Sequence, residues 1–308
     1  MELEVITNIL YATIRTGTPL LLVALGEMVC EKSGTLNLGQ EGMMLLGAVA
    51  GFITMYQCDN LFIGFSVAAL VGVMASLVFA FVALNLNASQ VAAGLALTIF
   101  GTGLSAFLGV DYEGKTINAL PTLAIAGFEH IPLLGKALFS QDAIVYLSWA
   151  LVLGAYLFFK YHRAGLAVRA IGENPSVGNN LGLPVMRTRY LAVMFGGAMA
   201  GIAGAYLSLA YTPLWTQNMT SGRGWIALAL VVFASWRIER VMLGAYLFGF
   251  ASIMHLVAQA LGLAVDSNLL AMLPYGATLI VLIMLSKNKQ KLKMYEPMWL
   301  GKPWHKGH

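Results

Sequence analysis

The stretch SGTLNLGQEGMMLLG, residues 33–47, is a polar, glycine-rich break between two apolar segments. In a chain this apolar, the break is expected at or within a membrane, where backbone polar groups cannot remain unpaired against lipid. Irregular backbone at that depth lines a cavity or packs inside protein, and Asn37, Gln40 and Glu41 are the polar side chains available there. The alternative is an interfacial loop with Glu41 in headgroup water, and the residues alone leave both interpretations open.

The composition predicts an all-α, polytopic integral membrane protein. The chain has 308 residues, of which 59% are hydrophobic and 10% charged, whereas soluble domains carry about 25% charged residues. A spanning helix needs about 20 mostly apolar residues. A single transmembrane domain, residues 1–308, is expected to hold nine segments, two of them short: 5–26, 42–57, 61–83, 88–109, 143–160, 190–211, 224–236, 241–261 and 268–286.

The basic residues indicate the orientation, because cytoplasmic loops carry an excess of Lys and Arg. The basic tail 287–308, which begins KNKQKLK, is therefore expected in the cytoplasm, and counting back through nine segments puts the N-terminus outside. With this topology 14 of the 18 Lys and Arg residues fall on the cytoplasmic side. The net charge of +4 is thus a topology signal and not a sign of nucleic-acid binding.

The segment starts indicate an internal repeat. Segments beginning near residues 5, 42, 61 and 88 are followed by a second set beginning near 190, 224, 241 and 268. Each set has its glycine-rich break, LNLGQEG (36–42) and NMTSGRG (218–224). The first set starts outside and the second inside, as in the inverted repeats of transporters. We therefore expect repeat A over about 5–109, a fifth segment and loop over 143–189, and repeat B over 190–286, although coincidental spacing stays open.

The second break, TQNMTSGRGW (216–225), offers Gln217, Asn218 and Thr220 to a polar solute. Together with Asn37, Gln40 and Glu41 they are the candidate residues of a substrate pathway. Arg15 lies about midway along the first segment. Because a buried Arg is costly in a membrane, we expect it to have a structural role, paired with a carboxylate or a helix end.

Catalytic and metal-binding patterns are lacking in the sequence. The five histidines are scattered without metal-ligand spacing, and G-x-S-x-G is absent. GVDYEGKT (109–116) fits the phosphate-loop pattern, but that motif requires a preceding strand, and here a membrane helix is expected. The sequence thus predicts neither an enzyme nor a cofactor or metal bound to this chain.

The island RAIGENPSVGNNLGLPV (169–185) separates the fifth and sixth segments. Asn174 suits a helix N-cap, Pro175 the first helical position, and Gly182 the position that ends a helix. The pattern predicts a short helix on the inner face, too short to span anything. It either docks into another protein or merely links two spans.

Three stretches carry a family resemblance that covers residues 10–285. The island resembles the cytoplasmic coupling loop of ABC-transporter permeases of the branched-chain amino acid, ribose and nucleoside importer group. GEMVCEKSGTLNLGQEGMMLLGA (26–48) and TQNMTSGRGWIALALVVF (216–233) resemble signatures of its nucleoside and simple-sugar branch. The likeness is strongest to the shorter permease subunit of bacterial nucleoside importers, whereas ASWRIER (234–240) departs from the usual pattern.

The resemblance implies a subunit that moves a nucleoside-like or simple-sugar solute inward across the bacterial cytoplasmic membrane by alternating access. It implies three protein partners: a second homologous permease, a cytoplasmic ATPase that holds ATP and Mg, and an extracytoplasmic solute-binding protein, for which loop 110–142 is a candidate contact. Coupling to the ATPase would involve the region from Glu173 to Gly182. The residues assigned to coupling are Arg169, Gly172, Glu173, Asn174, Pro175 and Gly182.

Three alternatives stay open at this stage. A branched-chain amino acid permease would need groups that meet a zwitterion, whereas the breaks offer mostly neutral amides and hydroxyls. An ion-coupled secondary transporter would need no ATPase. An embedded enzyme would show turnover by the single chain.

Overall fold

The computed structural model describes residues 2–124, 131, 134–260, 272, 276 and 295–305. Among these residues the regular structure is helical, with three isolated β-bridges in the connections. A 3-10 turn, η2 (Val110–Tyr112), follows α4, and two π-helical turns, η1 (Phe81–Asn85) and η3 (Leu207–Tyr211), extend α3 and α9. The α-helices are α1 (Glu2–Lys32), α2 (Gln40–Cys58), α3 (Leu61–Ala80), α4 (Gln90–Gly109), α5 (Leu134–Phe139), α6 (Ala143–Tyr161), α7 (Arg163–Glu173), α8 (Pro175–Asn180), α9 (Val185–Tyr206), α10 (Arg223–Phe233) and α11 (Ile238–Ala260).

Five helical runs in the described part are long and apolar enough to cross a membrane: Leu3–Lys32, Leu61–Asn85, Gln90–Tyr112, Ala143–Tyr161 and Val185–Tyr211. The chain is therefore an all-helical, polytopic membrane protein. The segment predicted as short at 224–236 corresponds to α10, whose 11 residues make about 16 Å of helix, roughly half of a hydrocarbon core. Segments 42–57 and 241–261 correspond to α2 and α11, and segment 268–286 lies outside the described residues.

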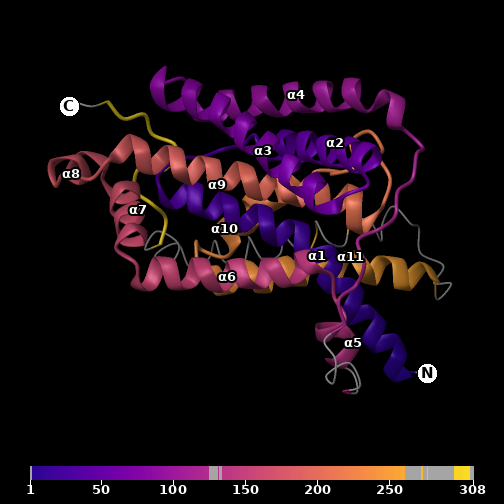
Figure 1. The fold of residues 1–308 in the computed structure, drawn as a ribbon. Coiled ribbons are helices and arrows are strands. Elements are labelled where there is room, and N and C mark those ends of the chain that lie inside the picture. Colours follow the sequence, from indigo (N-terminus) through magenta and orange to yellow (C-terminus); the bar gives the residue numbers. More distant parts are fainter. Residues whose placement is uncertain are drawn as a thin grey trace.

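Two antiparallel helices, α1 and α9, form the centre of the bundle (Figure 1). Their direction follows from their contacts, because Arg15 of α1 reaches Ala210 beyond the end of α9, whereas Cys30 reaches Ala192 near its start. The helix α3 packs against α9, α11 packs against α1, and α2 lies against both α3 and α9.

Glycines allow these helices to approach closely. A Cβ atom on Gly201 would lie 2.2 Å from the carbonyl oxygen of Ala68, and one on Gly204 would lie 1.9 Å from that of Met44. Small residues at such crossings are typical of membrane helix packing. The stretch GGAMAGIAGAY (196–206) therefore serves close helix packing.

The helix axes give the bundle two distinct ends (Figure 1). The helices α7 and α8 and the described C-terminal residues 295–305 lie at one end, whereas the N-terminus and α5 lie at the other. At this second end, residues 113–116 form bridges to Leu214 and Trp215. The pattern GVDYEGKT therefore begins at the last residue of the membrane helix α4 and contains η2, so a helix and not a strand precedes it, as expected.

Two parts of the island differ from the sequence prediction. The helix α7 extends from Arg163 to Glu173, so residues 169–173 belong to a helix that the polar composition did not indicate. Its apolar residues Val168 and Ile171 are buried on one side, and this one-sided burial stabilises a helix that is otherwise polar. The next long helix begins at Val185, directly after Pro184, and not near residue 190.

Candidate functional site

The two glycine-rich breaks meet at the carboxylate of Glu41. Its Oε1 accepts hydrogen bonds from the Thr220 hydroxyl at 2.5 Å and from the Gly222 N–H at 2.8 Å. Its Oε2 accepts one from the Gly224 N–H at 2.6 Å. Glu41 and Thr220, two of the predicted pathway residues, are 179 positions apart in the sequence and thus meet in one buried junction.

The carboxylate of Glu41 provides the cap that the start of α10 lacks. The N-cap residues of α2 and α10, Gly39 and Gly222, have no side chain that could accept from the first N–H groups. Glu41 lies in the first turn of α2 and also accepts from the first N–H groups of α10. A carboxylate near a helix N-terminus is stabilised by the helix dipole, and here one carboxylate serves two helices.

Glycine is required at residue 224 for this approach. A Cβ atom there would lie 2.5 Å from the backbone nitrogen of Glu41 and 2.6 Å from its Cα. Gly222 has φ +80, a left-handed conformation that glycine adopts without steric cost. The sequence GRG therefore shapes both the turn and the contact with the other break.

A second carboxylate, that of Glu27, holds the first break against α1. Glu27 is fully buried and accepts from the Asn37 N–H at 2.9 Å and from the side-chain amide of Gln40. Glu27 precedes the last residue of α1, Lys32, by five positions, about 8 Å along a helix. The chain therefore turns back beside α1 before α2 begins.

Other polar groups of the first break also have hydrogen-bond partners. The Asn37 Oδ1 accepts from the Gly39 N–H at 2.9 Å, and Gln90 and Thr98 of α4 bond the backbone of Leu36 and Leu38. The Gln40 Oε1, by contrast, is buried without a hydrogen-bond partner. Of the candidate pathway residues, four are thus buried at the junction: Asn37, Gln40, Glu41 and Thr220.

Gln217 and Asn218 lie apart from this junction, exposed on the connection before α10. Asn218 has φ +56, and its carbonyl accepts from the Ser221 N–H at 2.9 Å, so it shapes the turn that presents Thr220. The structure therefore does not bring these two side chains to Glu41 in this conformation.

Sequence reasoning did not select Glu27 or Glu31 as site residues. Glu31 is buried one turn after Glu27 on α1 and accepts from the indole N–H of Trp236. Trp236 lies in ASWRIER, the stretch that departs from the family pattern. Two carboxylates four positions apart in an apolar segment were the available signal, since an ionisable residue at membrane depth is rare and commonly functional.

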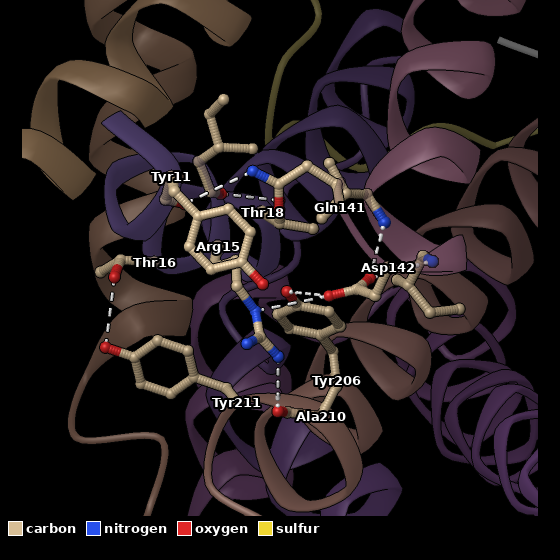
Figure 2. A network of polar contacts seen from close by, with 12 residues as sticks. Tyr11, Arg15, Thr16, Thr18, Gln141, Asp142, Tyr206, Ala210 and Tyr211 are labelled. Atoms are coloured by element: carbon tan, nitrogen blue, oxygen red, sulfur yellow. Dashed lines mark hydrogen bonds and ion pairs between the residues drawn. The ribbon is translucent and has the colours of Figure 1, made fainter. Parts of the chain in front are cut away.

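Arg15 pairs with a carboxylate at the other end of the bundle (Figure 2). Its Nε lies 3.5 Å from the Asp142 Oδ2, and its Nη2 donates to the Ala210 carbonyl at 2.8 Å. The Tyr206 hydroxyl donates to the same Asp142 oxygen at 2.8 Å, and the Asp142 Oδ1 caps α6. Arg15 thus connects α1 with the start of α6 and with η3. This position is consistent with the structural role expected for Arg15.

The end of the bundle that carries α7 and α8 presents the residues assigned to coupling. The Asn174 Oδ1 accepts from the N–H groups of Ser176 and Val177 at 3.1 Å, Pro175 begins α8, and Gly182 has φ +78 after its end. The predicted cap residues are confirmed, but Glu173 ends α7 and does not belong to the short helix. Arg169, Glu173, Asn174 and Gly182 are exposed, whereas Gly172 and Pro175 are buried.

Two apolar side chains extend from α8 and the turn after it. Val177 is 52% exposed and Leu181 is 74% exposed. Their neighbours on the inner side, Ile171 and Val185, are buried. A short capped helix that shows its own apolar residues to the outside is suited to insert into a groove of another protein.

Helices broken at glycine-rich starts, packed as membrane spans around buried polar groups, are typical of transport proteins. Residues 9–285 match the family described as branched-chain amino acid transport system / permease component. The chain belongs to this family, and it is therefore a transport subunit and not a catalytic one.

Relatives of known name support the same class. The chain is 43% identical to the putative glucose ABC transporter permease protein TsgC13 of Haloferax volcanii over 94% of this chain and 88% of that protein. It is 30% identical to the guanosine ABC transporter permease protein NupQ of Bacillus subtilis over 91% and 92%. The solved structure of PsaBC from Streptococcus pneumoniae in complex with Fab has the same fold, with a TM-score of 0.52 at 13% identity over 88% and 89%.

Proposed function

We propose that this chain is the membrane-spanning subunit of an ATP-driven importer that moves a nucleoside or a simple sugar into the cell by alternating access. The observation that carries the proposal is the junction at Glu41, where two broken helix starts from the two halves of the chain share one carboxylate. The relatives named for glucose and guanosine support the solute class, since both solutes present sugar hydroxyls.

An inverted repeat explains why the two helix starts meet. A Cβ atom on Gly72 of α3 would lie 2.1 Å from the Gly197 oxygen and 3.1 Å from the Gly201 Cα. In the second half, a Cβ atom on Gly249 of α11 would lie 2.6 Å from the Thr13 oxygen and 3.1 Å from the Gly17 Cα. The contacted residues of α1 and α9 correspond to each other with the same shift in numbering, since Thr13 corresponds to Gly197 and Gly17 to Gly201. This repeated crossing between antiparallel helices supports a pseudo-two-fold axis.

The orientation that we propose puts α7, α8 and the C-terminus in the cytoplasm and the N-terminus outside. The basic residues Arg163, Arg169 and Arg187 lie on or beside α7 and α8, and cytoplasmic loops are rich in such residues. The opposite end carries residues 110–124 and α5, and there we expect the solute-binding protein to dock. Because one named relative comes from Haloferax volcanii, we propose the cytoplasmic membrane without restricting it to bacteria.

The path for the solute is proposed to open at the junction of the two breaks. In this conformation Glu41, Gln40 and Thr220 are buried, so the junction is closed and no solute can reach these groups. Rocking of one half against the other would separate the two helix starts and expose them. Exposed amide and hydroxyl groups would then meet a hydroxylated solute, whereas a zwitterionic amino acid would need two opposite charges.

The partners follow from this class of importer. A cytoplasmic ATPase would hold ATP and Mg and receive α8, with Val177 and Leu181 in its groove. A second permease subunit would complete the membrane domain, and a binding protein would deliver the solute. Co-purification of a tagged chain with the products of its neighbouring genes tests each of these partners.

The experiment that tests the proposed solute is uptake by the assembled transporter. The chain, together with the second permease, the ATPase and the binding protein, is reconstituted in proteoliposomes that contain ATP. We expect accumulation of radiolabelled guanosine or glucose and none of radiolabelled leucine. Accumulation of leucine alone would contradict the proposed solute class and favour a branched-chain amino acid permease.

A further inference from the structure

The described C-terminal residues 295–305 lie as a strap across the end of the bundle that carries α7 and α8 (Figure 1). The Trp299 N–H donates to the Gly172 carbonyl at 2.9 Å, and the Gly301 N–H donates to the Gly34 carbonyl at 3.2 Å. Gly172 is in the last turn of α7, and Gly34 is in the connection between α1 and α2. One turn of the strap thus bonds both the coupling region and the first glycine-rich break.

Trp304 anchors the strap beside α8. It is 7% exposed and forms a buried apolar cluster with Ile171 of α7 and Val185 of α9. Its indole N–H donates to the Ser176 hydroxyl of α8 at 3.2 Å. A tryptophan whose ring is buried and whose N–H has a partner gives a large apolar contact with a defined orientation.

Beneath the strap, α7 and the end of α1 are in direct backbone contact. A Cβ atom on Gly172 would lie 2.2 Å from the Lys32 carbonyl oxygen and 3.3 Å from the Gly34 nitrogen. Arg189 of α9 also donates to the Ser33 carbonyl at 3.2 Å. These contacts would transmit a displacement of α7 and α8 to residues 32–34, at the start of the break 33–47 that contains Glu41.

We propose that Trp304 is a positioning residue for coupling: the strap 295–305 holds α7 and α8 as one rigid unit with residues 32–34. This inference rests on the proposed function, since it specifies how movement of α8 reaches the solute path. Without the strap, α8 would still contact the ATPase, but part of its movement would be lost in bending between α7, α8 and α1.

The test compares Trp304→Phe, Trp304→Ala and Ser176→Ala with the wild type in the assembled complex. Met298→Ala, a change at an exposed side chain of the same strap, is the matched control. Hydrogen exchange of the amides in residues 171–183 reports local opening. The loss of one hydrogen bond in Trp304→Phe should accelerate this exchange by about 2- to 10-fold, and Trp304→Ala should accelerate it further.

The second measurement is the number of solute molecules accumulated per ATP hydrolysed, with guanosine or glucose as the probe. We expect the ratio to fall several-fold in Trp304→Ala, less in Trp304→Phe and Ser176→Ala, and not in Met298→Ala. If Trp304→Ala does not assemble, the two milder variants carry the test. Unchanged exchange would overturn the inference, and so would faster exchange with an unchanged ratio. Absence of uptake by the wild type would instead contradict the proposed function, while the exchange measurement would still test the strap.

Discussion

Glu41 at the start of α2 accepts a hydrogen bond from Thr220 just before α10, at 2.5 Å across 179 positions of sequence. The contact joins the starts of two helices, and the same carboxylate pairs the N–H groups of Gly222 and Gly224 at the start of α10, which would otherwise be unpaired. Because an unpaired buried donor carries its full desolvation cost, the contact fixes the closed state of the junction. Its opening must be offset by interactions gained elsewhere in the transport cycle.

Glu41→Gln is expected to lower the melting temperature of the purified complex and to abolish uptake. A glutamine side chain has one acceptor oxygen, so the N–H of Gly222 or of Gly224 loses its partner, at a cost of about 1–3 kcal/mol. Thermal unfolding and uptake in proteoliposomes measure the two effects. Glu113→Gln, at an exposed carboxylate, should keep the wild-type melting temperature, and equal losses of melting temperature in the two variants would contradict the assigned role of Glu41.

Gly224→Ala should destabilise the junction without altering any polar group. The added methyl would lie 2.5 Å from the Glu41 nitrogen, and such overpacking costs about 1–3 kcal/mol. Melting temperature and uptake should both fall. Gly103→Ala on α4, where a Cβ would have nothing within 4 Å, is the control. An unchanged melting temperature for Gly224→Ala would show that α2 and α10 are not in this contact.

Arg15 and Asp142 should be energetically coupled. Asp142→Asn keeps an oxygen that can cap Ile144 and Val145 but removes the charge that faces Arg15. We expect Arg15→Met and Asp142→Asn each to lower the melting temperature, and the double variant to lose less than the sum. A coupling energy of about 0.5–3 kcal/mol is typical of contacting residues. Strict additivity in this double-mutant cycle would refute the pairing.

Val177→Asp should uncouple ATP hydrolysis from transport. Val177 is half exposed on α8, and a charge there must be desolvated if the helix enters an apolar groove. We expect the complex to insert in the membrane and to hydrolyse ATP, but its uptake should fall strongly. Val177→Ala, which adds no charge at the same position, is the control and should keep most of its uptake. Full uptake by Val177→Asp would exclude α8 as the coupling element.

The sequence predicted the broken helix starts because glycine and polar residues interrupt apolar segments, and that contrast is local. It predicted the caps of α8 for the same reason, since Asn174 and Pro175 act at the start of that helix and Gly182 acts directly after its end. The partner of Arg15 was not predicted, because Asp142 belongs to a connection whose position depends on packing. Trp304 carried no signal either, since one aromatic residue in a polar tail has no periodic pattern. Burial of Glu27 likewise depends on the helices that surround α1.

In the proposed importer, the energy for transport comes from ATP that another chain hydrolyses. The direct measurement is solute uptake in proteoliposomes that hold this chain either alone or with its permease, ATPase and binding-protein partners, with and without ATP and with and without a proton or sodium gradient. We predict uptake only in the full assembly with ATP, regardless of the ion gradient. Gradient-driven uptake by the chain alone would contradict the account.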